Sequence, residues 1–355
     1  MKIELGITSF GDNRTRYNEN GSYEKISAHE RIRNIVEEIQ VADEVGLDIY
    51  GLGEHHRKDY AVSDPVSILS AAAVLTKNIK LSTAVTVLSS DDPVRVYERF
   101  ATLDALSNGR AEIMAGRGSF IESFPLFGYD LNDYEILYEE KLDLLMKINQ
   151  SEKVSWQGTT RAPLNNLGVY PRAVQKELPI NIASGGTPKS SIRAAELGLP
   201  ITYAIIGGNP KRFRQNVNLY EMVAKDNGHD LSKMFITTNS WGFVADTDMV
   251  AYQKFYPSTK SSHDVLAKER GWPEYSEEMF MSEVEHGALY VGSPETVAQK
   301  IIDTVEALGS KRFMIQMPVG SMPHEDTIKA IRMFGENVKP IVDQYFEKNN
   351  ELSSK

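Results

Sequence analysis

The feature that most constrains the fold is a regular alternation of short apolar runs with longer amphipathic segments. The apolar runs have the length of strands, and the segments between them have the length and period of helices. A chain that alternates strand and helix in this way builds a parallel sheet with crossover helices. The eight predicted strands are Ile3–Thr8, Ile49–Gly53, Ile79–Leu88, Ala111–Gly116, Pro179–Ser184, Ile201–Ile206, Met234–Val244 and Arg312–Met317.

Many helices are predicted to start with the same signal, a capping residue followed by proline. The side-chain oxygen of the cap accepts from the free N–H groups of the first turn, and proline removes an N–H that has no partner there. The first helix instead has Ser27 and Glu30 at the spacing of a capping box and is predicted to close at Gly46. The cap-proline junctions are Asp64-Pro65, Asp92-Pro93, Thr187-Pro188, Asn209-Pro210 and Ser293-Pro294.

Eight strand-helix units favour a closed α/β barrel, the (β/α)8 or TIM barrel, over a doubly wound open sheet. The open sheet is the alternative, but no Gly-x-Gly-x-x-Gly turn follows the first strand. Because no repeat or linker divides residues 1–355, we predict one domain with loop insertions at the carboxyl face of the barrel. The insertions are 11–27, 118–134, 151–176 and 246–287.

Two of these insertions carry several aromatic residues. The segment 118–134 is predicted to be a loop that forms a cavity wall or a subunit contact, or that simply packs on the barrel rim. The segment 246–287 is either a mobile lid or a rigid helical insertion.

Composition excludes several classes of function and location. The formal net charge is −10 with no basic block, so neither nucleic acid nor an anionic membrane is an expected partner. Cysteine is absent, which excludes disulfides and thiolate chemistry and fits a reducing compartment. No secretion signal and no apolar run of membrane-spanning length is found in the sequence. We therefore predict a cytoplasmic protein.

Titratable side chains cluster where the second predicted strand ends, at Glu54, His55 and His56. Neighbouring side chains of an extended strand point to opposite faces, so His55 is expected to point away from Glu54 and His56. Adjacent histidines make a poor metal clamp and His-Glu-x-x-His is absent, so no metal site is predicted. His55 lies where barrel enzymes place their functional groups, although both histidines could simply bond to the backbone at a strand end.

A candidate anion site follows the fifth predicted strand, at Ser184, Gly185, Gly186 and Thr187. A glycine turn leading into a helix lets an anion approach backbone N–H groups at the positive end of the helix dipole. The alternative is an ordinary turn without a ligand.

Arg117 is a second candidate partner for an anion. It lies between Gly116 and Gly118 at a strand end, where the glycines leave room for a ligand against the backbone. Alternatively, it pairs with a neighbouring carboxylate. No Ser-His-Asp order and no paired-carboxylate signature is found. An anion site and one histidine in a barrel fit a phosphate-bearing cofactor.

Four stretches, taken together, resemble the bacterial luciferase-like flavin monooxygenase family. Leu52–His56 is similar to the family's Glu-His-His at the end of strand 2, and Leu81–Arg95 to its third strand and following helix start. Leu103–Gly118 and Gly292–Glu295 are similar to its fourth unit and to a C-terminal motif. The order and spacing of these stretches extend the resemblance over nearly the whole chain.

The resemblance implies a barrel that binds FMN at its carboxyl end and uses reduced FMN and O2 to oxygenate a small, hydrophobic organic substrate. His55 corresponds to the catalytic histidine beside the flavin. The family's non-prolyl cis peptide, which lies against the flavin ring, maps to Ala84 and Val85. Arg117 and the turn Ser184–Thr187 map near the FMN phosphate.

The resemblance further implies a homodimer and a separate flavin reductase that supplies reduced FMN. Two other functions remain open: hydride transfer with a deazaflavin, and flavin binding without catalysis. The sixth strand lacks the tryptophan that luciferases have near the flavin, so light emission is not implied.

Overall fold

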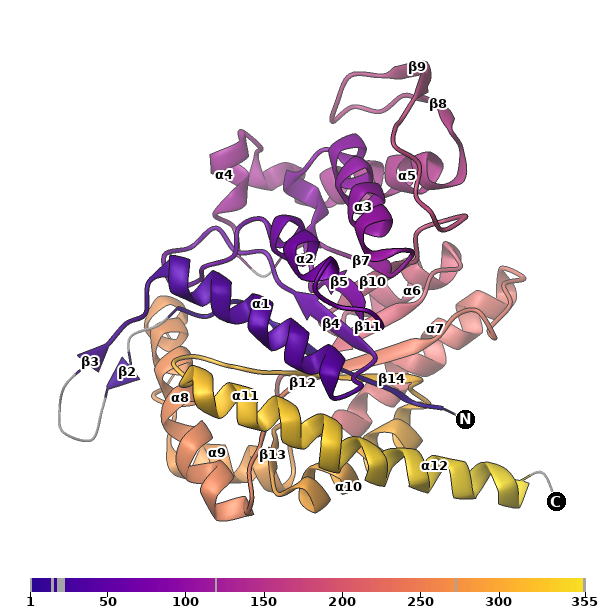
Figure 1. The fold of residues 1–355 in the computed structure, drawn as a ribbon. Helices are drawn as coiled ribbons and strands as arrows, with labels where there is room; N and C mark the ends of the chain where they lie inside the picture. Colours follow the sequence, from indigo (N-terminus) through magenta and orange to yellow (C-terminus); the bar gives the residue numbers. More distant parts are fainter. Residues whose placement is uncertain (1, 14–15, 18–22, 119, 272, 354–355) are drawn as a thin grey trace.

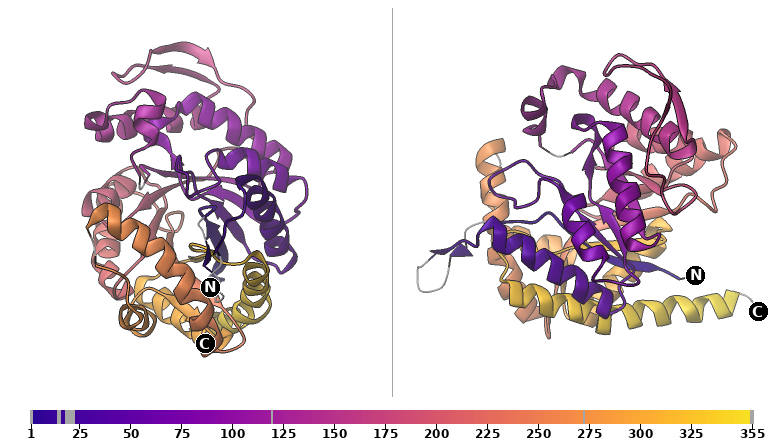
Figure 2. Two further views of the ribbon diagram at one scale, coloured as in Figure 1. Left: turned by 90° about the vertical axis from the view of Figure 1, so that its left-hand side faces the viewer. Right: turned by 45° about the horizontal axis from the view of Figure 1, so that its top comes forward.

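The computed structural model describes residues 2–13, 16–17, 23–118, 120–271 and 273–353. Eight strands pair side by side in parallel, and the ring closes because β10 pairs with β7 as well as with β11. The predicted TIM barrel is therefore confirmed (Figures 1 and 2). Its strands are β1 (Glu4–Ser9), β4 (Ile49–Leu52), β5 (Lys80–Thr83), β7 (Ala111–Gly116), β10 (Ile180–Ser184), β11 (Ile201–Ala204), β12 (Ile236–Val244) and β14 (Arg312–Gln316).

Helices surround the barrel (Figure 2). Ser27 caps the first helix by accepting from the Glu30 N–H, and Asp64, Asp92, Asn209 and Ser293 accept in the same way at their helix starts. The 3-10 turn η3 (Pro210–Phe213) precedes α7, and the π-helical η4 (Phe334–Val338) joins α11 to α12. The outer helices are α1 (Ala28–Glu44), α2 (Pro65–Ala73), α3 (Pro93–Ser107), α5 (Tyr134–Gln150), α6 (Pro188–Glu196), α7 (Arg214–Asp226), α10 (Pro294–Leu308), α11 (His324–Met333) and α12 (Lys339–Ser353).

The third predicted strand differs from expectation, because Ile79–Leu88 is not continuous. After β5 the Ala84–Val85 peptide is cis, and a short strand β6 (Thr86–Val87) pairs with β7 before the 3-10 turn η1 (Leu88–Ser90). The hydroxyl groups of Thr83 and Thr86, on either side of the cis peptide, are hydrogen-bonded to each other at 2.9 Å. The cis peptide lies where the family resemblance places it.

The insertions contain regular structure. Segment 246–287 contains α8 (Asp248–Arg270) and α9 (Glu277–Glu285), so it is largely helical. Segment 118–134 contains α4 (Ser123–Phe127) and the turn η2 (Leu131–Asp133), so its prediction as a loop is wrong in part. The remaining short elements are β2 (Arg16–Tyr17), β3 (Tyr23–Glu24), β8 (Lys153–Trp156), β9 (Leu164–Gly168) and β13 (Tyr290–Gly292), which pairs with β12.

Three insertions follow barrel strands and therefore start at the carboxyl face. The fourth, 151–176, links the end of α5 to the start of β10, so it starts at the opposite face. Its β8–β9 hairpin stands off from the barrel (Figure 1). Beyond β8 the chain reaches back toward the carboxyl face, where Arg161 Nε donates to Asp92 Oδ2 at 2.9 Å.

The barrel interior is filled with side chains in layers. At the amino end of the strands, Arg312 Nη1 on β14 lies 2.6 Å from Glu112 Oε1 on β7, which is the strand opposite in the ring. A cluster of Ile49, Met114 and Met314 with Ala84 lies above this pair. Open space for a ligand is consequently expected at the carboxyl mouth.

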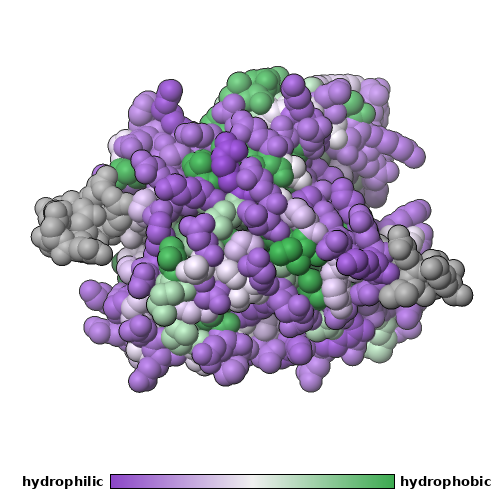
Figure 3. All heavy atoms as spheres, turned by 60° about the horizontal axis from the view of Figure 1, so that its bottom comes forward, coloured by the Kyte–Doolittle hydropathy of each residue, from purple (hydrophilic) through white to green (hydrophobic). Residues whose placement is uncertain are grey.

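The molecular surface is mainly polar on the side drawn in Figure 3, where hydrophobic residues form small separate patches. Among the described residues, no helix combines the length and the apolar character needed to cross a bilayer.

Candidate active site at the barrel mouth

His55 lies directly beyond β4 in a pocket of aromatic rings, with 7% of its surface exposed. Its backbone N–H donates to the Val62 carbonyl at 2.8 Å. Its imidazole stacks on Tyr60 with ring centres 4.3 Å apart, and Phe10 and Phe120 lie at 4.6 and 5.3 Å. The aromatic insertion 118–134 therefore forms part of the wall around His55.

Ala84 lies near His55, and Val85 lies near Gly116, the residue before Arg117. A Cβ atom on Gly53 would come within 2.6 Å of Phe10 Cδ1 and within 3.1 Å of both the Ala84 carbonyl oxygen and His55 Cε1, so these groups pack closely around a glycine. The side chain of Val85 lies over Gly116, where a Cβ atom would come within 2.6 Å of it. Val87 covers Gly118 in the same way. The prediction that these glycines leave room for a ligand is therefore wrong, because valine side chains fill that room.

Glu54 and His56 point away from His55, as predicted. Glu54 Oε1 and His56 Nε2 are 2.9 Å apart, and Glu54 Oε2 accepts from the Val87 N–H at 3.0 Å. Both residues line a cavity of about 330 Å³ between α2 and α3. In the described part of the chain, no group of three or more histidines and carboxylates could hold a metal ion.

The turn after β10 has an open side. Ser184 Oγ accepts from the Gly186 N–H at 3.0 Å, and Gly186 has a left-handed φ of 96°. Apart from Gly185 itself and its two chain neighbours, no described residue has an atom within 4 Å of a Cβ built on Gly185. Thr187 occupies the cap position, but its hydroxyl bonds to that of Ser190 at 2.8 Å instead of a backbone N–H, which corrects the predicted cap. A ligand can therefore approach this turn at Gly185.

Arg117 pairs with Glu135, which is the alternative that the sequence left open. Glu135 also accepts from Lys189 Nζ at 2.8 Å and from Arg193 Nη2 at 3.1 Å. These hydrogen bonds, chiefly the one from Lys189, lower the pKa of Glu135 to about 2. Lys189 and Arg193 belong to α6, which starts at the Ser184–Thr187 turn, so the structure brings Arg117 and the helix after this turn together.

Sequence reasoning did not identify this cationic cluster of Arg117, Lys189 and Arg193. A usable signal was present, because Lys189 and Arg193 are four residues apart, as are the acidic residues Glu135 and Glu139. Complementary pairs at this spacing favour packing of one helix face against the other.

Arg57 joins three segments above His55. Its Nη1 lies 2.5 Å from Glu122 Oε1 in the aromatic insertion, and its Nη2 lies 2.5 Å from Glu269 Oε1 near the end of α8. Its guanidinium carbon lies 4.5 Å from the centre of the Phe120 ring. The mouth is thereby covered by two different insertions that one cation holds together.

A cavity of about 650 Å³ opens at the other half of the mouth. Its barrel side includes Gly185 and Trp241, whose indole N–H donates to Gln316 Oε1 at 3.1 Å. Its outer side comes from α8 and α9 and includes His263, which sequence reasoning missed. Open space at Gly185 and the cations on α6 together fit the phosphate of a cofactor.

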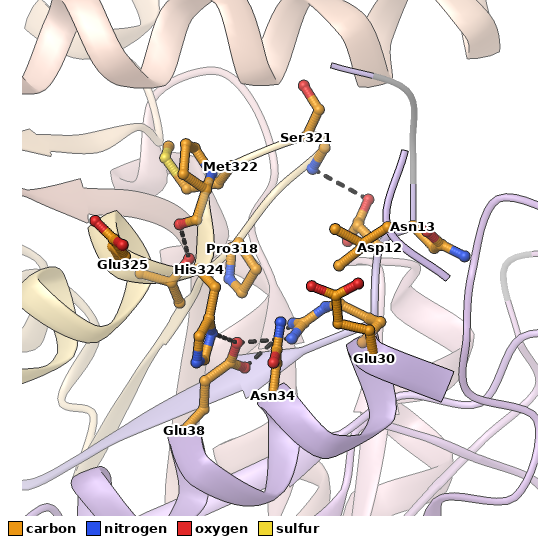
Figure 4. Close-up of a pocket in the computed structure, with 15 residues that line it drawn as sticks. Asp12, Asn13, Glu30, Asn34, Glu38, Pro318, Ser321, Met322, His324 and Glu325 are labelled. Atoms are coloured by element: carbon orange, nitrogen blue, oxygen red, sulfur yellow. Dashed lines mark hydrogen bonds and ion pairs between the residues drawn. The ribbon is translucent and has the colours of Figure 1, made fainter. Parts of the chain in front are cut away.

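A separate cavity of about 360 Å³ lies between α1 and the loop before α11. Figure 4 shows Glu38 on α1 pointing toward His324, and its Oε1 lies 2.6 Å from Arg31 Nη1 and 3.4 Å from His324 Nδ1. None of the predicted site residues, all of which the structure describes, lines this cavity. We therefore do not assign it to the candidate active site.

Solved structures of similar fold support the architecture. The chain is similar to the monooxygenase RslO1 from Streptomyces bottropensis, with a TM-score of 0.82, 24% identity and coverage of 95% of this chain and 99% of the other. It is also similar to the oxygenating constituent of 3,6-diketocamphane monooxygenase of Pseudomonas putida in complex with FMN (TM-score 0.75, 20% identity, coverage 96% and 99%). The coenzyme F420-dependent tetrahydromethanopterin reductase of Methanopyrus kandleri is similar as well (TM-score 0.71, 20% identity, coverage 96% and 99%). At these identities the likeness shows the fold alone.

Sequence comparison identifies the family. The chain is 24% identical to an alkanal monooxygenase alpha chain of Photobacterium leiognathi over 323 residues, which is 84% of this chain and 90% of the relative. Residues 3–312 match the family model described as luciferase-like monooxygenase. With a match over most of its length and the barrel that the resemblance implied, the chain belongs to the luciferase-like monooxygenase family.

Proposed function

We propose that the protein is an FMN-dependent monooxygenase that uses reduced FMN and O2 to oxygenate a small, hydrophobic organic substrate. The observation that carries the proposal is the buried His55 beside Ala84 and Val85, at the same mouth as the open turn at Gly185. Reduced FMN, when bound, supplies the electrons with which O2 is activated. The proposal treats residues 1–355 as one barrel domain.

Each predicted site residue has a role in this proposal. Ala84 and Val85 support the face of the flavin ring. Arg117 and the turn Ser184–Thr187 hold the phosphate, with Arg117 exchanging part of its contact with Glu135 for the phosphate oxygens. The rings around His55 exclude water from the reacting atoms.

His55 is proposed to hold or move the proton that substrate oxygenation requires. An imidazole changes its charge near neutral pH, which suits a general acid or base. The stacked Tyr60 ring and the backbone hydrogen bond to Val62 fix the orientation of His55.

The test mixes the protein with reduced FMN without O2, then admits O2 and measures both the return of oxidised FMN and ¹⁸O in the product. With a turned-over substrate, His55→Ala should lower product yield by roughly 100-fold or more while FMN affinity is retained. His286→Gln is the matched control, because the His286 side chain is exposed. Unchanged product yield in His55→Ala would remove His55 from the mechanism.

A second candidate function is deazaflavin-dependent hydride transfer, which the fold likeness to an F420-dependent reductase supports. Titration with FMN and with F420 separates the two candidates, and so does the requirement for O2. A protein that binds FMN tightly but never consumes O2 would instead be a non-catalytic flavin carrier.

The family resemblance also leads us to propose the partners. A separate reductase would supply reduced FMN in the cytoplasm, and the working form would be a homodimer. Size measurement in solution, and activity with and without an added flavin reductase, test these two proposals.

A further inference from the structure

We propose that the 650 Å³ cavity at the mouth binds a planar aromatic substrate that carries a hydrogen-bonding oxygen, and that His263 recognises this oxygen. This inference rests on the proposed function, because it assumes that the flavin ring occupies the half of the mouth around His55.

The order of the strands separates the two halves. In the closed ring, β11 is the strand opposite β4, and β12 is the strand opposite β5. His55 and Ala84 follow β4 and β5, whereas Ala204 and Trp241 of β11 and β12 line the cavity. The cavity thus faces the proposed flavin position across the mouth, and the two halves meet at Gly185 after β10.

The walls of the cavity favour a flat aromatic molecule. Phe213, Trp241 and Tyr275 present aromatic rings, and Met279 and Leu289 add apolar side chains. Rings pack best against other rings in stacked or edge-to-face geometry, and methionine adapts to their edges. A volume of about 650 Å³ exceeds what a single small ring needs and is in the range of pockets that enclose drug-sized molecules.

His263 is a suitable polar partner beside these rings. The other charged and polar side chains that line the cavity are Arg212, Glu278, Ser282 and Glu283. It lies on α8, half-buried, and stacks on Tyr275 with ring centres 4.5 Å apart and an interplanar angle of 20°. The Tyr275 N–H donates to Asp264 Oδ1 at 3.2 Å, and its carbonyl accepts from Lys260 Nζ at 3.2 Å, so this pair of rings has a fixed position.

The protonation state of His263 also suits recognition of a neutral oxygen. Burial lowers the pKa of His263, and although Asp264 opposes this effect, the imidazole is favoured in its neutral form at pH 7. A neutral imidazole has one donor and one acceptor nitrogen, so it can bond to a phenol hydroxyl or to a quinone-type carbonyl.

The test uses calorimetric titration of the full chain without flavin. We expect 2-naphthol to bind, naphthalene to bind more weakly and decanal to bind most weakly. His263→Phe keeps the ring but removes the hydrogen bond, so it should weaken 2-naphthol binding roughly 3- to 10-fold and leave naphthalene unchanged. His263→Gln should restore most of the preference, and His286→Gln should change nothing.

Filling the cavity gives an independent measurement. Met279→Trp should abolish binding of both aromatic probes, while FMN affinity, measured by flavin fluorescence, stays the same. Equal weakening of 2-naphthol and naphthalene by His263→Phe, or decanal binding as tightly as 2-naphthol, would overturn the inference. Loss of FMN binding in Met279→Trp with 2-naphthol binding retained would overturn it too, because the cavity would then belong to the flavin. If no flavin binds but the aromatic pattern holds, the proposed function fails and the cavity assignment stands.

Discussion

Replacement of Glu135 by Gln is expected to tighten FMN binding about fivefold. Three cations, Arg117, Lys189 and Arg193, face two carboxylates, Glu135 and Glu139, so the cluster has a net charge of about +1. A phosphate adds roughly −1.5 to −2 charges and must compete with Glu135 for the same donors. Glu135→Gln removes one repelling charge and leaves three cations in place.

The magnitude follows from the exposure of the carboxylate. The Glu135 side chain is 42% exposed, so solvent screens its interactions with the three cations. Ion pairs of this kind contribute up to ~1 kcal/mol, which corresponds to about a fivefold change in affinity. Because the pKa of Glu135 is lowered to about 2, the carboxylate is ionised above that pH. Its contribution to folding stability is present above its ordinary pKa and is lost only as the pH falls toward 2.

The assay compares two ligands that differ only in the phosphate. FMN affinity should rise in Glu135→Gln, riboflavin affinity should not change, and the gain should shrink with added salt. Glu139→Gln should give a smaller gain, because Glu139 contacts Lys189 and Arg193 while Glu135 also contacts Arg117. Weaker FMN binding in Glu135→Gln, or an equal change for riboflavin, would show that these cations do not hold the phosphate.

Three further predictions concern the barrel, its cover and the α1–α11 contact. Glu112→Gln leaves the buried Arg312 without its full countercharge, so the free energy of unfolding in urea should fall by ~3–5 kcal/mol, while FMN affinity at the far end of the barrel stays the same. Glu269→Gln frees Arg57 from α8, so the association of FMN measured by stopped flow should become up to about fivefold faster. An unchanged rate would show that FMN entry does not require the Arg57–Glu269 ion pair to open. Hydrogen bonds to Glu38 and Glu37 raise the pKa of His324. The contribution of His324 to folding stability is therefore full below its ordinary pKa and is lost as the pH rises through the raised value. Thermal melts from pH 5 to 9 should show this loss in the wild type and not in His324→Gln.

The barrel could be predicted because its signals are local and repeated. Each of the eight predicted strands overlaps a strand of the ring, and the cap-proline junctions mark where the following helical segments start. The break within Ile79–Leu88 could not be read from residue type, since the whole segment has strand-forming residues. Its turn depends on the pairing of β6 with β7, which is a tertiary contact.

The site was predictable only as far as strand ends define it. His55, Arg117 and the Ser184–Thr187 turn follow parallel strands, and the ring brings the ends of those strands to one face. Arg57 and His263 depend on how the insertions fold back over that face, and a single sequence does not encode this packing in any local pattern. The contacts of Glu135 were predictable in part. The four-residue spacing of Glu135 and Glu139 and that of Lys189 and Arg193 are visible in the sequence, but the sequence does not show that these two helices pack together.

The division between scaffold and insertions has a consequence for substrate choice. Packed layers and the Arg312–Glu112 pair fix, from inside the barrel, the strands that lead to His55 and Gly185. The outer wall of the cavity, by contrast, is built largely from α8, α9 and the turn between them. Substitutions in this wall can therefore alter the substrate that fits while the residues proposed to bind flavin stay in place. The same reasoning explains why a barrel that is recognisable from its strands carries so little information about its substrate. In the proposed assignment, the strands determine where chemistry takes place, and the inserted helices determine which molecule reaches it.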